Sequence, residues 1–412
     1  MSAPTAHNYR TGRVVGLAGT AALGGFLFGF DSAVINGAAS AIKSTFGLSS
    51  LALGFTVSIA LIGSAIGAWF AGMLAEKYGR RRVMLIAAAL FIAAALGQAF
   101  PFGIADLLVW RLIGGAGIGI ASVMAPMYIA EIAPAQLRGR LGSMQQLAIV
   151  LGIFATGITN YLILEAAGGN STSAWLFGIA AWQWMFLIMV IPALVYGAFA
   201  LQLPESPRYL VEVGRFDEAA SVLKQVYTGD INPILNDIKA SLDGESRPSI
   251  KDLRGRKFGL LPIVWVGIIL SAFQQFVGIN AVFYYSNTIW EAVGFSEDQA
   301  FQTSLITTGV NVAFTLVAIA LIDKVGRKPL LLVGSIGMFV MLAILSFVFG
   351  TAPIGPDGSP VLADGSDIVA LLAFNIYVAF FAATWGPVVW VLLGEMFPNR
   401  IRAAALALAT AV

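Results

Sequence analysis

The chain contains no cysteine among its 412 residues, which excludes disulfides, thiolate catalysis and Cys-ligated metals. Its one histidine, His7, lies in a polar N-terminal tail, which argues against a histidine proton relay or a His-rich metal site. Charged residues make up 11% of the chain, whereas soluble proteins carry about 25%. No nucleophile–base pair or metal-ligand set is evident. We therefore expect neither an enzyme nor a cofactor, no metal, and no nucleic-acid partner.

Long apolar runs dominate what is present. Hydrophobic residues make up 58% of the chain, and a run of about 20 apolar residues is long enough to span a membrane. Ten such runs occur, at 14–38, 51–74, 83–102, 107–130, 141–164, 182–203, 258–290, 301–322, 329–350 and 368–393. The seventh is long enough to include a broken helix. An eleventh starts at AAALALATAV, so we expect helices 11 and 12 of a complete bundle to be missing. The predicted class is an all-α polytopic membrane protein.

Lysine and arginine predict the orientation. Nearly all of the 24 lie in the N-terminal tail, in the segment 204–257 or in the loops that follow an even-numbered run. The exceptions are Lys43 and Arg111. Because positive residues concentrate on the cytoplasmic side, we expect a multi-pass protein of the plasma membrane, a bacterial inner membrane, with a cytoplasmic N-terminus.

The chain also repeats itself. Gly79 and Arg80, after the second run, match Gly326 and Arg327, after the eighth. EIAPAQLRGR, after the fourth run, matches EMFPNRIRAA, after the tenth, and aligns Glu131 with Glu395. Two halves of equal orientation joined by a long cytoplasmic linker match the parallel-repeat plan of major facilitator transporters, which place their site at the midplane between the halves.

Several motifs resemble those of sugar porters of the major facilitator superfamily, across essentially the whole chain. They are PESPRYL (204–210), QQFVGINAVFYYS (274–286), AEIAPAQLRGR (130–140), DKVGRK (323–328) and WGPVVWVLLGEMFPNRIRA (385–403). The resemblance is strongest to bacterial proton-coupled pentose, hexose and polyol symporters. One departure is Glu76, where the family usually has Asp in the motif between helices 2 and 3.

The resemblance implies two six-helix bundles related by a pseudo-two-fold axis. We expect an N-terminal bundle at 1–203, a cytoplasmic linker with short amphipathic helices at 204–257, and a C-terminal bundle at 258–412 that holds helices 7–10 and the start of 11. The implied function is proton-coupled sugar symport by alternating access. The expected partners are a monosaccharide, protons and the lipid bilayer, and we expect a monomer.

A sugar site requires side chains that both donate and accept hydrogen bonds, with aromatic faces against the ring. Amides supply most of the polarity inside these runs, and a break at Gly278 would let those of the seventh run converge. The resemblance carries Gln146, Gln274, Gln275, Asn280, Asn311 and Trp390 onto family sugar ligands, with Tyr284 and Phe28 as nearby walls or gates. The alternative for each amide is a hydrogen bond between helices, worth about 0.6 kcal/mol.

Asp31 and Arg111 interrupt the first and fourth apolar runs. A charge at bilayer depth costs at least about 2.5–3.5 kcal/mol and is tolerated mainly beside a partner or a cavity. At 1.5 Å per residue, Asp31 lies about 26 Å from the inner start of its helix and Arg111 about 8 Å from the outer end of its own, so their depths are compatible. The family implies a proton acceptor at Asp31 and its partner at Arg111. The alternative is a static buried ion pair.

The repeated arginines and glutamates predict clamps between helices at the cytoplasmic ends, which hold the outward-open state and release as the protein opens inward. Glu131 with Arg138 and Glu395 with Arg402 are expected pairs. The full predicted gate set is Glu76, Arg80, Glu131, Arg138, Glu205, Arg208, Arg327, Glu395 and Arg402. The alternative is simple anchoring of loops by positive charge.

Two other functions stay open at this point. A facilitative sugar uniporter would have the same site without coupling to protons, and a membrane sugar sensor would bind without transport. The residues do not separate xylose from glucose, galactose or myo-inositol, because one hydroxyl changes only a few hydrogen bonds.

Overall fold

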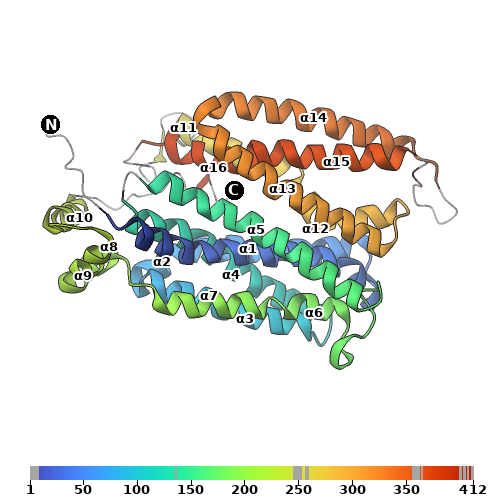
Figure 1. The fold of residues 1–412 in the computed structure, drawn as a ribbon, viewed down its shortest axis with the longest axis horizontal. Coiled ribbons are helices and arrows are strands. Elements are labelled where there is room, and N and C mark those ends of the chain that lie inside the picture. Colours follow the sequence, from blue (N-terminus) through green and yellow to red (C-terminus); the bar gives the residue numbers. More distant parts are fainter. Residues whose placement is uncertain are drawn as a thin grey trace. The chain divides into compact units, whose positions relative to one another are not determined.

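The computed structural model describes residues 9–134, 137–244, 253–255, 259–354, 362, 365–398, 401, 405 and 408–409. These residues form α-helices joined by short loops, and the part of the chain described contains no β-sheet, only isolated bridges (Figure 1). The predicted all-α class is confirmed.

The helices follow the predicted runs closely. Those of the first half are α1 (Thr11–Thr45), α2 (Ser50–Tyr78), α3 (Arg80–Ala99), α4 (Ile104–Ile132), α5 (Arg138–Ala166), α6 (Ala181–Leu187) and α7 (Val190–Gln202). A single 3-10 turn, Leu176–Gly178, precedes α6. Three short helices follow, α8 (Pro207–Glu212), α9 (Phe216–Val226) and α10 (Asn232–Gly244). The last group is α11 (Pro262–Phe276), α12 (Ile279–Ala292), α13 (Glu297–Val325), α14 (Arg327–Thr351), α15 (Ser366–Ala383) and α16 (Trp385–Met396).

Within the described residues, ten helical segments are long and apolar enough to cross a membrane, which agrees with the ten predicted runs. The sixth, seventh and tenth segments each consist of two helices, α6–α7, α11–α12 and α15–α16. Most of the predicted eleventh run lies outside the described residues.

The break in the seventh segment occurs at Gly278, as expected. Gly278 has φ 92° and ψ 8°, a left-handed conformation that suits glycine because it has no Cβ. The break in the tenth segment, at Thr384 (φ −136°, ψ −87°), was not predicted. Pro387 contributes to it, because a proline lacks the N–H that a continuous helix uses and fits best in a first turn, here that of α16.

The chain divides into two compact units, and the helices α1, α2 and α5 each have residues in both units. The first unit comprises Met1–Asp31, Ser58–Ile149 and Leu187–Arg247, and the second Ser32–Val57, Val150–Phe186 and Pro248–Val412. The predicted bundle boundaries at 203 and 258 stay a prediction, since a grouping by contacts does not test them.

In the first unit, α2 and α4 cross with their backbones in contact. Each helix carries a Gly-xxx-Gly pair, Gly63 with Gly67 on α2 and Gly115 with Gly119 on α4. A Cβ on any of these four would clash with a backbone carbonyl of the other helix. In a membrane the hydrophobic effect does not drive helices together, because lipid tails are as apolar as the side chains. Helices therefore associate mainly by close packing, which small residues allow. This crossing fixes the position of Arg111, one turn before Gly115.

The three short helices also belong to the first unit, and Figure 1 shows them grouped beyond the end of α7. The face of α9 formed by Ala219, Val222, Leu223 and Val226 is buried, which is the spacing of an amphipathic helix. Arg10 donates its backbone N–H to the carbonyl oxygen of Val226 at 2.8 Å. Short helices therefore occupy the predicted linker region, and α9 is amphipathic.

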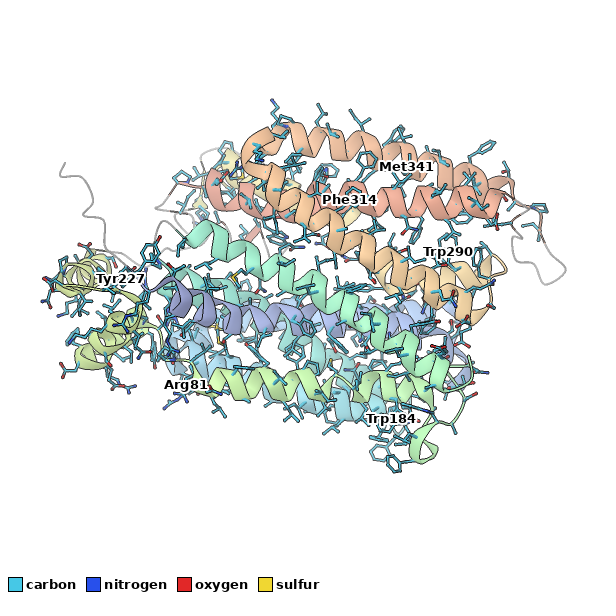
Figure 2. All side chains as sticks on the ribbon, in the orientation of Figure 1. Arg81, Trp184, Tyr227, Trp290, Phe314 and Met341 are labelled. Carbon is cyan, nitrogen blue, oxygen red and sulfur yellow. The ribbon has the colours of Figure 1, made fainter. Side chains whose placement is uncertain are left out.

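In the second unit, aromatic residues pack α12 against α15. Trp290, labelled in Figure 2, is fully buried, and its ring lies 5.2 Å from that of Phe374 and 5.3 Å from that of Phe295. This packing holds the end of α12 that follows the polar residues described below.

Candidate functional site

Asp31 and Arg111 lie in one buried polar cluster of the first unit. Their exposed fractions are 0% and 2%, and Gln98 of α3, also 0% exposed, lies with them. Arg111 Nη1 donates to Gln98 Oε1 at 3.4 Å. Asp31 interacts electrostatically with Arg111, but neither carboxylate oxygen makes a hydrogen bond with a described residue. The two predicted partners therefore lie together in one buried cluster with Gln98.

Gln98 is a site residue that the sequence analysis missed. Gly114 of α4 leaves the space in which it meets Asp31, since a Cβ there would lie 3.1 Å from Gln98 Nε2 and 3.5 Å from Asp31 Oδ1. In the sequence, Gln98 is a single amide in the third apolar run. Taken alone, such an amide indicates only a hydrogen bond between helices. In the structure it lies beside both charges and can donate to one and accept from the other.

The helix break brings three predicted sugar ligands of the second unit together. Gln275 Nε2 donates to Gln274 Oε1 at 2.7 Å, and Asn280 Nδ2 donates to Gln275 Oε1 at 2.6 Å. Gln274 is buried, Asn280 half-buried and Gln275 exposed. The result is a chain of amides that leads from the protein interior to an open surface, with unused donors and acceptors along it.

Tyr377 of α15 stabilises this break. Its hydroxyl donates to the carbonyl oxygen of Val277 at 2.6 Å, one of the groups that the end of α11 leaves without a helical partner. The position of the amide chain thus depends on a buried tyrosine from another helix, which the sequence analysis did not single out.

Asn311 belongs to a polar stripe along α13. The buried residues Thr303, Thr307, Asn311 and Thr315 recur every four residues, so they lie on one face of the helix. Only Asn311 was predicted, because Ser and Thr in a helix often bond to their own backbone; Thr307 Oγ1 donates to the carbonyl oxygen of Thr303 at 3.0 Å.

The remaining predicted sugar-site residues are half-buried. Tyr284 is on α12, and Trp390, on α16, packs against the cluster that contains Val389 and Leu393. Phe28 and Gln146 belong to the first unit, where Phe28 packs against the main apolar core. Their predicted roles stay predictions.

A second polar cluster joins the later part of α1 to α12 and α13 within the second unit. Asn36 Nδ2 donates to Ser286 Oγ at 2.9 Å, and the backbone N–H of Asn287 donates to Asn36 Oδ1 at 3.1 Å. Asn287 also bonds to Ser304 of α13. A cavity of about 20 Å³ adjoins these groups, enough for one water molecule. One turn further along α1, Ser40 Oγ donates to Glu291 Oε2 at 2.6 Å.

The repeated arginines form two similar clamps. In the first clamp, Arg80 Nε and Nη2 donate to Glu131 at 2.9 and 2.7 Å, and Nη1 donates to the Ala75 carbonyl at 3.2 Å. In the second clamp, Arg327 Nε and Nη2 donate to Glu395 at 3.0 and 2.6 Å, and Nη1 donates to the Ile322 carbonyl at 3.0 Å. Both arginines therefore bind a carboxylate with two parallel bonds and also cap the end of the helix before them.

The other predicted gate residues differ in environment. Glu205 accepts hydrogen bonds from the backbone N–H groups of Arg80 and Ser206, both at 2.9 Å, so it caps the start of α3. Glu76 is exposed and Arg208 half-buried. Arg402 and the side chain of Arg138 lie outside the described residues, as does their predicted pairing with Glu395 and Glu131.

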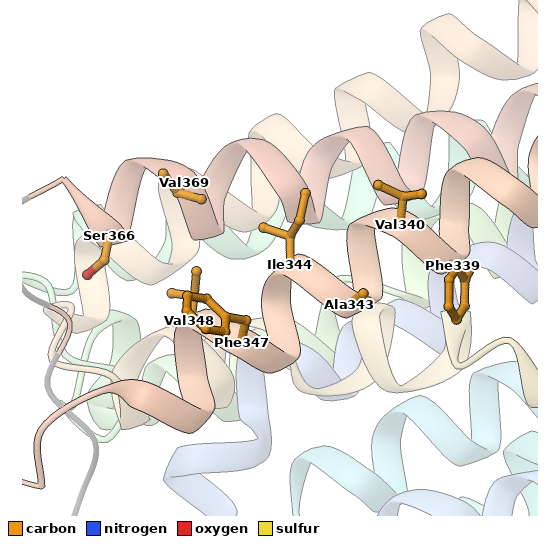
Figure 3. A pocket seen from close by; sticks show the side chains of 8 residues that line it. All are labelled: Phe339, Val340, Ala343, Ile344, Phe347, Val348, Ser366 and Val369. Atoms are coloured by element: carbon orange, nitrogen blue, oxygen red, sulfur yellow. The ribbon is translucent and has the colours of Figure 1, made fainter.

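The groove of about 540 Å³ between α14 and α15 is not a sugar site. Figure 3 shows its lining, Phe339, Val340, Ala343, Ile344, Phe347, Val348, Ser366 and Val369. Ser366 is the one residue among them with a polar side chain. A sugar needs several donors and acceptors, and this lining cannot supply them.

Comparison with known proteins agrees with the geometry. A family model described as sugar (and other) transporter matches residues 17–412. The chain is 52% identical over 411 residues to the glucose transport protein of Synechocystis sp., which covers 100% of this chain and 88% of that protein. It is 38% identical over 430 residues to the D-xylose-proton symporter of Escherichia coli, which covers 98% of this chain and 83% of that one.

A solved structure is also similar over nearly the whole chain. It is that of a proton:xylose symporter of the major facilitator superfamily bound to 6-bromo-6-deoxy-D-glucose, with a TM-score of 0.80, 38% identity, and coverage of 98% of this chain and 86% of that one. The chain belongs to the sugar transporter family of the major facilitator superfamily.

Proposed function

We propose that this sugar transporter is a proton-coupled symporter of pentoses or hexoses that works by alternating access. The observation that carries the proposal is Asp31, a fully buried carboxylate whose two oxygens make no hydrogen bond with described residues while Arg111 lies nearby. A buried carboxylate without direct partners is costly when charged, so it is suited to bind and release a proton. The named proton symporters among the relatives support this reading.

The proton step depends on the competition around Asp31. When Asp31 is ionised, its attraction to Arg111 opposes its own desolvation. A proton from the outer solution that binds to a carboxylate oxygen removes this attraction. Gln98, bonded to Arg111, is then the partner that keeps the arginine oriented. Release of the proton to the inner side restores the charge and resets the cluster.

When a sugar binds, hydrogen bonds to its hydroxyls would replace hydrogen bonds between the amides of this chain. Gln275 and Asn280 hold each other at 2.6 Å without a ligand, and each can turn its amide to a hydroxyl at little cost because both partners donate and accept. Since Asn280 begins α12 just after the break at Gly278, sugar binding acts directly on a helix end that can pivot. Gln146, Phe28, Tyr284, Asn311 and Trp390 would complete the site.

Two sets of contacts would alternate during transport. The polar contacts of α1 with α12, made by Asn36 and Ser40, are proposed to close the outer side. The first and second clamps, at the predicted cytoplasmic ends, are proposed to hold the outward-open state and to rearrange as the protein opens inward. The plasma membrane location and the cytoplasmic N-terminus belong to the same proposal.

A uniporter with the same sugar site is the alternative, and the glucose transport protein, whose name mentions no proton, is consistent with it. Adding xylose or glucose to weakly buffered, de-energised cells that express the protein distinguishes the two. We expect the external medium to become alkaline as sugar and protons enter together. Sugar entry without alkalinisation would contradict symport.

A further inference from the structure

A second carboxyl group, Glu291, lies half-buried near the end of α12. Its Oε2 accepts a hydrogen bond from Ser40 of α1 at 2.6 Å. Its Oε1 is buried and makes no hydrogen bond with any described residue. The transport mechanism proposed above uses its contact with Ser40 but assigns it no proton. An ionisable side chain in a membrane-spanning segment is costly unless it has a partner or a function.

No cation compensates Glu291 within the part of the chain that the structure describes. The charged side chains near this end of the surrounding elements are Lys43 at the end of α1, Glu165 near the end of α5, Glu297 and Asp298 at the start of α13, and Asp367 at the start of α15. Lys43 is exposed, and no ion pair with Glu291 is formed. The charge that acts on Glu291 is that of Glu297, another carboxylate. Burial and the carboxylate of Glu297 oppose a negative charge on Glu291, and only the hydrogen bond from Ser40 favours it.

We propose that Glu291 is a second proton-binding group, which must be protonated when α12 closes against α1. A neutral carboxylic acid keeps its hydrogen bond with the Ser40 hydroxyl and avoids an uncompensated buried charge. The proton comes from the outer solution as the contact forms and returns to it when the contact opens. No proton crosses the membrane by this route, so Glu291 regulates closure and does not drive transport.

The surrounding contacts explain how this proton affects the transport cycle. Asn36 bonds to α12 one turn before Ser40 does, so Glu291 is the last point of a continuous polar seam. The first turn of the same helix contains Asn280, a predicted sugar ligand. Protonation at one end of α12 therefore stabilises the position of the other end, and acid should favour closure with sugar bound.

The inference rests on the proposed function, and sugar counterflow at equal pH on both sides of proteoliposomes tests it. Asp31→Asn protein removes the titration of Asp31 from the comparison. In the Asp31→Asn protein we expect the rate of counterflow to fall as the pH rises. On this alkaline limb of the pH–rate profile the fall should be at most about tenfold per pH unit, because a single group titrates. Adding Glu291→Gln should flatten this limb. Adding Glu165→Gln, the matched change of an exposed carboxylate, should leave it unchanged.

Infrared spectroscopy gives a readout that does not depend on transport. The carboxylic-acid C=O band of the Asp31→Asn protein should disappear with Glu291→Gln and persist with Glu165→Gln. An unaltered alkaline limb or an unaltered band in Glu291→Gln would overturn the inference. Ser40→Ala, a milder change, should slow counterflow at every pH and keep the slope. Absence of sugar counterflow in the wild type would instead refute the proposed function, and the infrared band would still test Glu291.

Discussion

The two clamps have the same hydrogen-bonding pattern, but the side chains of the first clamp are buried and those of the second are more exposed. In the first clamp the side chains of Arg80 and Glu131 are 7% and 11% exposed, whereas in the second those of Arg327 and Glu395 are 25% and 51% exposed. Removing one partner of a buried pair leaves an uncompensated charge and costs far more than breaking an exposed one. Duplication has thus preserved the geometry of the clamp, while burial has made the first clamp the stronger structural element.

The first clamp also has additional partners. The ring of Tyr209 lies 5.5 Å from the Arg80 guanidinium, within the range of a cation–π contact, and Glu205 caps the same helix start. The linker helix α8, which contains Tyr209, is therefore attached to the first clamp. We propose that the second clamp is the one that rearranges more easily during transport.

Arg80→Ala should have the largest effect on stability. It leaves Glu131 buried without its partner, which we expect to destabilise the protein by about 3–5 kcal/mol. Thermal unfolding of the purified protein in detergent measures this as a lowered melting temperature. Arg80→Lys keeps the charge but loses the two parallel bonds, so it should recover only part of the loss. Full stability in Arg80→Ala would show that burial does not strengthen this clamp.

The glycines before the two clamps sharpen the comparison. Gly79 has φ 85° and ψ 163°, and Gly326 has φ 90° and ψ 161°, a region adopted almost only by glycine, so alanine at either position should cost about 1–3 kcal/mol in backbone strain. At Gly79 the new Cβ would also collide with Glu205, whereas at Gly326 the nearest atom is Pro329 Cδ at 3.9 Å. Gly79→Ala should therefore lower the melting temperature more than Gly326→Ala. Equal effects would contradict the described packing.

Glu205→Gln tests the extra component of the first clamp. It removes a negative charge from the N-terminus of α3, where a carboxylate stabilises a helix by about 0.3–1 kcal/mol. The amide oxygen can still accept one hydrogen bond from Arg80. We expect a small loss of thermal stability that shrinks further at high salt, because screening weakens the charge term. A loss as large as that of Arg80→Ala would mean that Glu205 is the principal partner.

Arg327→Ala should be the mildest change. An ion pair this exposed contributes about 0–1 kcal/mol, so the melting temperature should fall little. If the second clamp is the one that rearranges during transport, the same variant should still change the rate of sugar counterflow at constant protein level. A large loss of stability would contradict the contrast between the clamps.

Sequence alone predicted the spans and the helix break well, because both depend on local properties. Apolar length indicates a span, and Gly278 indicates a left-handed turn. The sequence also located the repeated arginines, but it did not predict the pair that Glu131 forms with Arg80, and the expected pairing with Arg138 lies outside the described residues. The structure pairs Glu131 with Arg80, 51 residues away. Partners so distant in the chain are set by how helices cross, which a single sequence does not reveal.

The residues that escaped prediction are those whose role depends on neighbours. Gln98 is one amide in an apolar helix, and only its position beside Asp31 and Arg111 makes it notable. The threonines of α13 resemble ordinary helix residues until the stripe is seen to be buried. Tyr377 could not be linked to Val277, 100 residues earlier. The midplane sugar site stays a prediction that rests on the repeated halves and the family resemblance.

The most direct test of the central claim is sugar accumulation by wild-type protein and Asp31→Asn in proteoliposomes with an inward proton gradient. Radiolabelled xylose and glucose report uptake, and Asp106→Asn, which changes a carboxylate at the start of α4, is the matched control. We predict gradient-driven accumulation in the wild type and the control, and its loss in Asp31→Asn while counterflow survives. Equilibration without accumulation in all three proteins would contradict proton coupling, and Asp31 would then be part of a static polar cluster.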